Sequence, residues 1–259
     1  ARNGDRTVFV SDVLGGTPLG LPAKPGVLVP FRHDEYVLVR GSQLAPVEGF
    51  LDLHLTEELR EVTYLDGARL TAVDHPAGTE ICPNERFCFP PFPEPHVHSM
   101  DGALAPLRAT GSDGKDWTAA LARVDAAQAA PFTLEEEQYA GHAKPWFVEL
   151  EFERQAILRT PKLRLALTGW FYWSDSTANV ASAGAGLAFV PPTLEIPDGR
   201  GGWKAAGPPV GFPSGKTKTM VIDVTGILSR DDPRIRVSTT LRLYWDAILL
   251  AVDGDDAPR

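Results

Sequence analysis

The clearest pattern of apolar and polar positions lies near the C-terminal end, in residues 234–253. Odd-numbered positions such as Ile235, Leu243 and Trp245 are apolar, while the even-numbered positions up to Asp246 are mainly charged or polar. A period of two predicts a strand with one buried face, because successive side chains leave a strand on opposite sides. Beyond Asp246 both parities are apolar, so we expect this end of the strand to be covered on both faces.

Shorter runs of the same kind occur along most of the chain, including residues 147–153, 163–167 and 220–224. Together with the final run they predict a β-sandwich of the jelly-roll type in residues 145–259. Residues 1–110 carry further short alternating runs and are expected to form an N-terminal β-rich domain. The predicted fold class is therefore mainly all-β, with two β-rich domains.

The segment between them, residues 111–144, is expected to be a helical connector. Asp116 can cap a first helix, and Thr133 with Glu136 forms a capping box for a second that ends near Gly141. The apolar stripe of the first helix consists of Trp117, Leu121 and Val124.

Composition narrows the choice of partner. The 259 residues carry a formal net charge of −9 and include 24 glycines and 23 prolines, which suit many short strands joined by turns. An acidic chain without a basic segment argues against a nucleic-acid partner. No apolar run approaches the roughly 20 residues that a membrane-spanning helix needs. The chain begins without Met, from which we expect a processed chain or a fragment.

Four consecutive aromatic residues, 170–173, form the strongest candidate binding feature. On a strand, Trp170 and Tyr172 share one face, so one pair can pack in the core while the other lies flat for stacking on a sugar ring. The alternative is that both faces are buried. The expected ligand-binding residues are Trp170, Tyr172, Trp173, Asp175 and Asn179, with Trp203 as a second platform.

Two candidate metal sites follow from the polar residues. Asp175 with its Ser and Asn neighbours, or the acids near Asp198, offer the oxygen ligands that a structural Ca²⁺ prefers. His96 and His98 place two imidazoles on one face of an extended segment, where His33 and an acid can complete a site. The alternative for the histidines is a plain surface position. No other cofactor is indicated.

Several stretches resemble a known class of bacterial protein, namely VFVSDVLGGTPLGL, LTGWFYWSDS, GFPSGKTKTMVIDVTG and LRLYWDAILL. They are similar to the C-terminal region of large exported proteins that carry FG-GAP (VCBS-type) repeats with an ASPIC/UnbV-like segment. The resemblance implies a secreted, all-β, non-catalytic region, outside the cell or in the periplasm. Residues 145–253 also resemble the galactose-binding-like jelly roll. The chain departs from the class in having no propeller repeats.

The only two cysteines, Cys82 and Cys88, are either two buried thiols or one local disulfide. Their spacing does not suit a structural zinc site, which needs four ligands. Because an exported chain meets oxidising conditions, we expect the disulfide.

The leading hypothesis is a non-enzymatic extracellular binding or assembly module that contacts a glycan or a partner protein. One alternative is an enzyme, either metal-dependent through His96 and His98 or active on carbohydrates. Another is an accessory subunit of a larger complex, which an exposed apolar patch would indicate.

Overall fold

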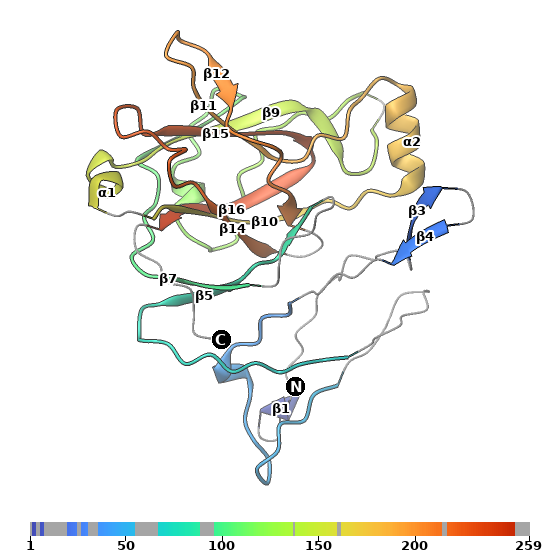
Figure 1. The fold of residues 1–259 in the computed structure, drawn as a ribbon, viewed down its shortest axis with the longest axis vertical. Helices are drawn as coiled ribbons and strands as arrows, with labels where there is room; N and C mark the ends of the chain where they lie inside the picture. The colour runs from blue at the N-terminus through green and yellow to red at the C-terminus, as the bar shows by residue number, and fades with distance from the viewer. Residues whose placement is uncertain are drawn as a thin grey trace.

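The computed structural model describes residues 2–3, 6–7, 20–24, 27–30, 36–54, 67–88, 96–136, 138–159, 162–213 and 217–251. Within these residues the secondary structure is mainly β-strand, which confirms the all-β prediction. Figure 1 shows a two-layered body of strands, with residues 36–54 lying below it in that view. No helix among the described residues has the length and hydrophobicity of a membrane span.

The two layers are antiparallel sheets with strand orders β12-β11-β15-β9-β8 and β14-β10-β16. The larger sheet consists of β8 (Arg108–Gly111), β9 (His142–Glu151), β11 (Thr193–Pro197), β12 (Trp203–Ala205) and β15 (Arg234–Leu241). The smaller sheet consists of β10 (Arg164–Phe171), β14 (Lys218–Asp223) and β16 (Leu243–Ala251).

One cluster of buried apolar side chains joins the two sheets. In β9, Val148 and Leu150 are fully buried, and Phe152 follows them into the core just past the end of the strand. Glu149 and Glu151 lie between them and remain partly exposed. This is the alternation that the sequence predicts, and it gives the larger sheet one dry face and one wet face.

The long C-terminal run is two strands instead of the single strand expected. β15 ends at Leu241 and β16 begins at Leu243, and the two lie in opposite sheets. At the break, the amide of Arg242 donates to the Gly141 carbonyl, and the Arg242 carbonyl accepts from the Tyr172 amide, both at 2.9 Å. The alternation passes through the break because Leu241 and Leu243 both face the shared core.

A β-bulge explains why both parities become apolar beyond Asp246. The pairing of β16 with β10 skips Asp246, so the parity of the core-facing residues changes there. Even-numbered Ile248 and Leu250 are fully buried in the main core. Odd-numbered Ala251 packs instead on the outer face of the smaller sheet.

A hairpin from the N-terminal half covers that outer face. Its strands are β5 (Glu80–Pro83) and β7 (Val97–Met100), which lie beneath the smaller sheet in Figure 1. A second buried cluster forms there from Cys82, Met100, Ala166, Val221 and Ala251. The outer face is therefore covered at the end of the sheet that holds Ala251, as the apolar end of the final run predicts.

The remaining strands form two-stranded antiparallel sheets. They are β6 (Arg86–Phe87) with β13 (Phe212–Pro213), β1 (Arg2–Asn3) with β2 (Arg6–Thr7), and β3 (Gly20–Lys24) with β4 (Val27–Pro30). A 3-10 turn, η1 (Gly41–Gln43), lies in the N-terminal region.

The helices lie elsewhere than predicted. The first expected helix is reduced to the 3-10 turn η2 (Ala119–Leu121), and the described residues of the second expected helix, 133–141, are not helical. Beyond η2 the chain runs back along β16 and forms bridges at Ala122 and Ala129, which a longer helix would prevent. The α-helices of the described residues are α1 (Arg154–Arg159) and α2 (Ser176–Gly184).

The sandwich also takes in residues upstream of 145. β8 is an edge strand of the larger sheet, and the segment after η2 bridges to the smaller one. Much of the segment expected to be a connector therefore packs as part of the sandwich, and β5 and β7 pack against its outer face.

Candidate functional site

The aromatic run lies at the end of β10 and just beyond it. Phe171 points into the core, is 8% exposed and packs on Phe212 with ring centroids 5.0 Å apart. Trp170 and Tyr172 are both partly exposed, with ring centroids 6.4 Å apart. Because the strand ends at Phe171, Trp173 does not follow that residue into the core and is 58% exposed.

The row of aromatic side chains extends onto the neighbouring strand β16. Trp170 is the register partner of Tyr244, and their rings stack with centroids 4.4 Å apart and planes only 6° from parallel. At the other end of this row of rings, Trp173 stacks on Tyr172, with ring centroids 6.1 Å apart and an angle of 21° between the ring planes. Trp170, Tyr172, Trp173, Tyr244 and Arg242 together form what we call the aromatic platform.

Arg242 belongs to the platform through its guanidinium group. Its centre lies 4.1 Å from the centroid of the Tyr172 ring, a cation–π contact, and its Nε–H donates to the Tyr244 hydroxyl at 2.9 Å. The strand break places this side chain between the two tyrosines. Sequence reasoning missed Arg242 and Tyr244, since only the strand register brings them beside the aromatic run.

Asp175 and Asn179 were expected to supply oxygens to a ligand, but the structure uses them internally. Asp175 is the N-cap of α2, and its carboxylate accepts from the Ala178 amide at 2.7 Å. The amide oxygen of Asn179 accepts from the Ser174 hydroxyl at 2.7 Å and lies 3.0 Å from His142 Nε2. These contacts hold α2 against β9 and position the loop that follows Trp173.

Trp203 lies on the other sheet and forms a separate cluster. Its ring lies on one side of the Arg236 guanidinium, at 4.1 Å, and the ring of Phe147 lies 3.7 Å from the same group. Trp203 is on β12, at the edge of the larger sheet, whereas the platform is on the smaller sheet. The expected second platform is thus occupied by an arginine of the protein itself.

The structure lends no support to the expected metal sites. The rings of His96 and His98 lie together, with centroids 4.4 Å apart. Yet within the described residues no group of three or more His, Cys, Asp or Glu side chains could hold a metal ion. His33 lies outside the described residues.

Asp198, the alternative to Asp175 as the expected calcium ligand, closes the turn between β11 and β12. Its carboxylate accepts from the amides of Arg200 at 2.7 Å and Gly202 at 2.9 Å. These hydrogen bonds lower the pKa of Asp198 from its usual value, and the hydrogen bond from the Arg200 amide has the largest effect. The oxygens that were expected to bind calcium therefore stabilise a turn.

The expected disulfide is not formed. Cys82 lies on β5 within the second buried cluster, while Cys88 follows β6, which pairs with β13 instead of β5. Cys82 thus lies in one strand and Cys88 just after another, and the two strands have different partners. Burial, with a further contribution from the charge of Glu80, raises the pKa of Cys82 to about 12. Burial also raises the pKa of Cys88.

No protein-family model, curated protein or solved structure matches the chain.

Proposed function

We propose that the protein is a non-enzymatic binding module that takes a glycan on the aromatic platform, outside the cell or in the periplasm. The observation that carries the proposal is the exposed Trp173 ring stacked on Tyr172. Aromatic rings present flat apolar surfaces, and the apolar faces of sugar rings are complementary to such surfaces. The stacked rings of Trp170 and Tyr244 extend this surface across the sheet.

The surroundings of the platform support a preformed site. Each ring is held by a neighbour through stacking, and Phe132 makes an edge-to-face contact with Tyr244, with ring centroids 5.3 Å apart. A rigid surface loses little conformational freedom when a ligand binds, which favours affinity. Arg242 and the tyrosine hydroxyls supply polar groups beside the apolar rings. The resemblance to exported FG-GAP-associated regions supports the proposed location.

The test begins with a glycan array probed with the intact protein, followed by calorimetry on the glycans retained. Stacking of a flat ring on an aromatic side chain contributes about 1–3 kcal/mol where nucleic-acid bases are concerned. We therefore expect Trp173→Ala to weaken glycan binding at least about fivefold. Trp203→Ala is the matched control, because its ring is on the other sheet, and it should bind as the unaltered protein does. Equal losses in both variants would refute the proposal.

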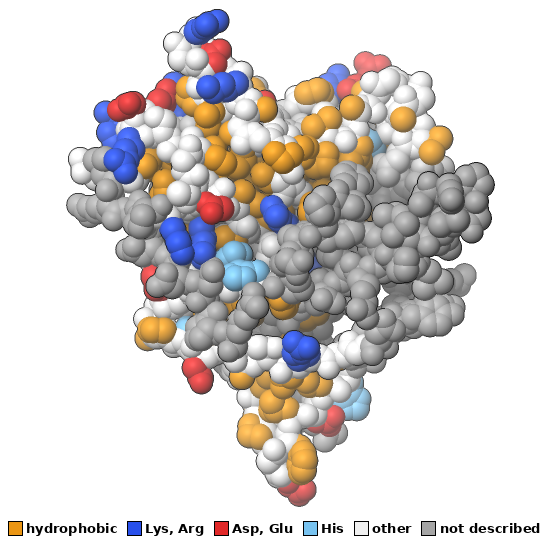
Figure 2. Space-filling model, in the orientation of Figure 1, with side chains coloured by type: hydrophobic (Ala, Val, Ile, Leu, Met, Phe, Trp, Pro, Cys, Tyr) orange, Lys and Arg blue, Asp and Glu red, His pale blue; other side chains and the backbone are white. Residues whose placement is uncertain are grey.

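A second candidate is contact with a partner protein through residues 36–54. Several large apolar side chains are exposed there, and Phe50 is 76% exposed beside a tight turn. Figure 2 shows hydrophobic side chains gathered over the protruding lower tip, where this segment lies in Figure 1. Exposed apolar patches mark protein contacts in many soluble proteins. If a second copy is the partner, light scattering should show a dimer that Phe50→Ser converts to monomer.

A further inference from the structure

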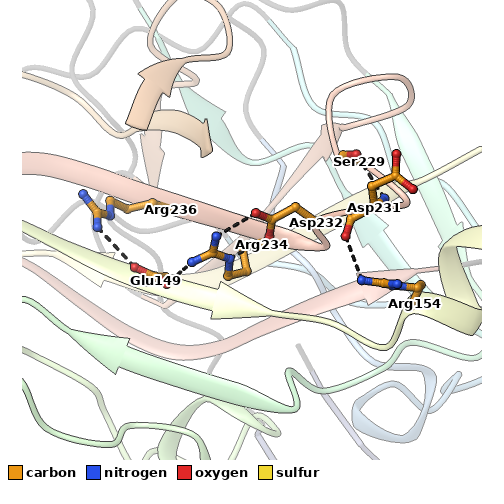
Figure 3. Close-up of polar contacts among 7 residues, drawn as sticks. All are labelled: Glu149, Arg154, Ser229, Asp231, Asp232, Arg234 and Arg236. Atoms are coloured by element: carbon orange, nitrogen blue, oxygen red, sulfur yellow. Dashed lines mark hydrogen bonds and ion pairs between the residues drawn. The ribbon is translucent and has the colours of Figure 1, made fainter. Parts of the chain in front are cut away.

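The final run of the chain carries three arginines at even-numbered positions, and they differ in whether a carboxylate lies beside the guanidinium group. Arg234 is 2.6 Å from Asp232 and 3.5 Å from Glu149. Arg236 is 3.1 Å from Glu149. Figure 3 shows both guanidinium groups directed at these carboxylates. The positive charge on this face of the larger sheet is therefore compensated within the protein.

Arg242 is the exception. Within the described residues no carboxylate lies within ion-pairing distance of its guanidinium, and Nε is the only side-chain nitrogen that donates a hydrogen bond. A guanidinium has five N–H donors, so the two terminal nitrogens keep theirs for another acceptor. The side chain is partly exposed and is held in place by the rings of Tyr172 and Tyr244. It is a positioned cation that has no counter-charge among the residues that the structure describes.

The terminal nitrogens of arginine form a planar fork that matches the two oxygens of a carboxylate. We infer that the glycan bound by the aromatic platform is acidic, with a sugar ring stacked on Trp173 and a carboxylate paired with Arg242. This inference rests on the proposed function and names the class of sugar, a uronic acid. The overall charge of −9 makes general attraction of acidic chains unfavourable, so the recognition depends on this one contact.

The test compares two ligands that differ only in charge, an oligouronate and the same oligosaccharide after chemical reduction of its carboxyl groups. Calorimetry on the full chain should give at least about tenfold tighter binding of the oligouronate. Arg242→Gln should bind both ligands with the affinity that the unaltered protein has for the reduced one. Arg234→Gln is the control, and it should keep the preference because its charge is already paired. The preference should also weaken as salt is raised.

The outcomes separate the two claims. Equal affinity of the unaltered protein for both ligands would overturn the inference and leave the proposed function standing. Failure to bind the oligouronate, when other glycans on the array are retained, would likewise overturn the inference alone. Failure to bind any glycan on the array would overturn both. The comparison of ligands on the unaltered protein does not require the Arg242 variant to fold, so loss of that variant leaves the test intact.

Discussion

At the scale of single residues, Asp246 shows how one buried polar side chain directs the local chain path. It is 3% exposed and occupies the bulge in β16. Its carboxylate accepts from the amides of Asp125 at 3.1 Å and Ala126 at 2.7 Å. Ala126 has a positive φ of 66°, a conformation that non-glycine residues rarely adopt. The carboxylate thus stabilises a strained turn against the sheet.

Replacing Asp246 by Ala should lower the free energy of unfolding by about 1–3 kcal/mol, because two amides lose the buried carboxylate that accepts their hydrogen bonds. Asp231→Ala is the control, since Asp231 is exposed, and it should change stability by no more than about 0.5 kcal/mol. Denaturant titration of both variants measures the difference. Similar stabilities would show that the carboxylate does not hold the turn.

The Cys82 thiol should be unreactive in the folded protein. A pKa of about 12 in place of 9.0 lowers its thiolate fraction at pH 8 about a thousandfold, and the thiolate is the reactive form. Iodoacetamide should therefore leave Cys82 unmodified in the native protein and modify it in guanidinium chloride. Mass spectrometry without reductant reads both states. If the chain instead resists labelling in guanidinium chloride and its mass is two daltons below that of the reduced chain, the two cysteines form a disulfide.

At the scale of elements, β16 marks the limit of pattern reasoning. Alternation predicts the dry faces of β9 and β15, because β9 keeps one parity from Trp146 onward and β15 does so along its length. It does not predict the change of sheet at Arg242, since both halves face the same core. Nor does it predict the bulge at Asp246, since Ile248, Leu249 and Leu250 are all apolar and only the pairing with β10 decides which ones face the core.

The bulge makes neighbouring leucines unequal. Leu250→Ala should cost about 2–5 kcal/mol, as Leu243→Ala should, because both side chains are fully buried in the main core. Leu249→Ala should cost less than about 1.5 kcal/mol, because that side chain lies on the other face and is partly exposed. Urea titration of the three variants gives the loss of unfolding free energy for each, and so their rank. If Leu249 ranked above Leu250, the register would have to continue without a bulge.

At the scale of the whole molecule, the N-terminal half and the sandwich share a buried cluster through β5 and β7. The apolar end of the final run predicts that something covers it, but not that the cover comes from β5 and β7. The aromatic platform is likewise only partly predictable from the sequence. Trp170 and Tyr172 are predictable as neighbours on one face, whereas Arg242, Tyr244 and the separate position of Trp203 depend on strand order and register.

Met100 tests whether the hairpin stabilises the sandwich. Met100→Ala should lower the free energy of unfolding by about 2–5 kcal/mol, because this side chain is buried between the hairpin and the smaller sheet. Leu107→Ala is the control, since Leu107 is largely exposed and should change stability by about 0.5 kcal/mol or less. Thermal melting of both variants gives the comparison. An unchanged melting temperature for Met100→Ala would mean that the hairpin does not cover the sheet.

The central claim is that a glycan binds on the aromatic platform, and fluorine NMR of the protein labelled with 5-fluorotryptophan tests it most directly. The chain has six tryptophans, and single Trp→Phe variants assign their resonances. On titration with a glycan that the protein retains, the Trp173 resonance should shift most and that of Trp170 next. Trp203, on the other sheet, and Trp245, fully buried in the core, should not shift. A shift at Trp203 without one at Trp173 would contradict the account.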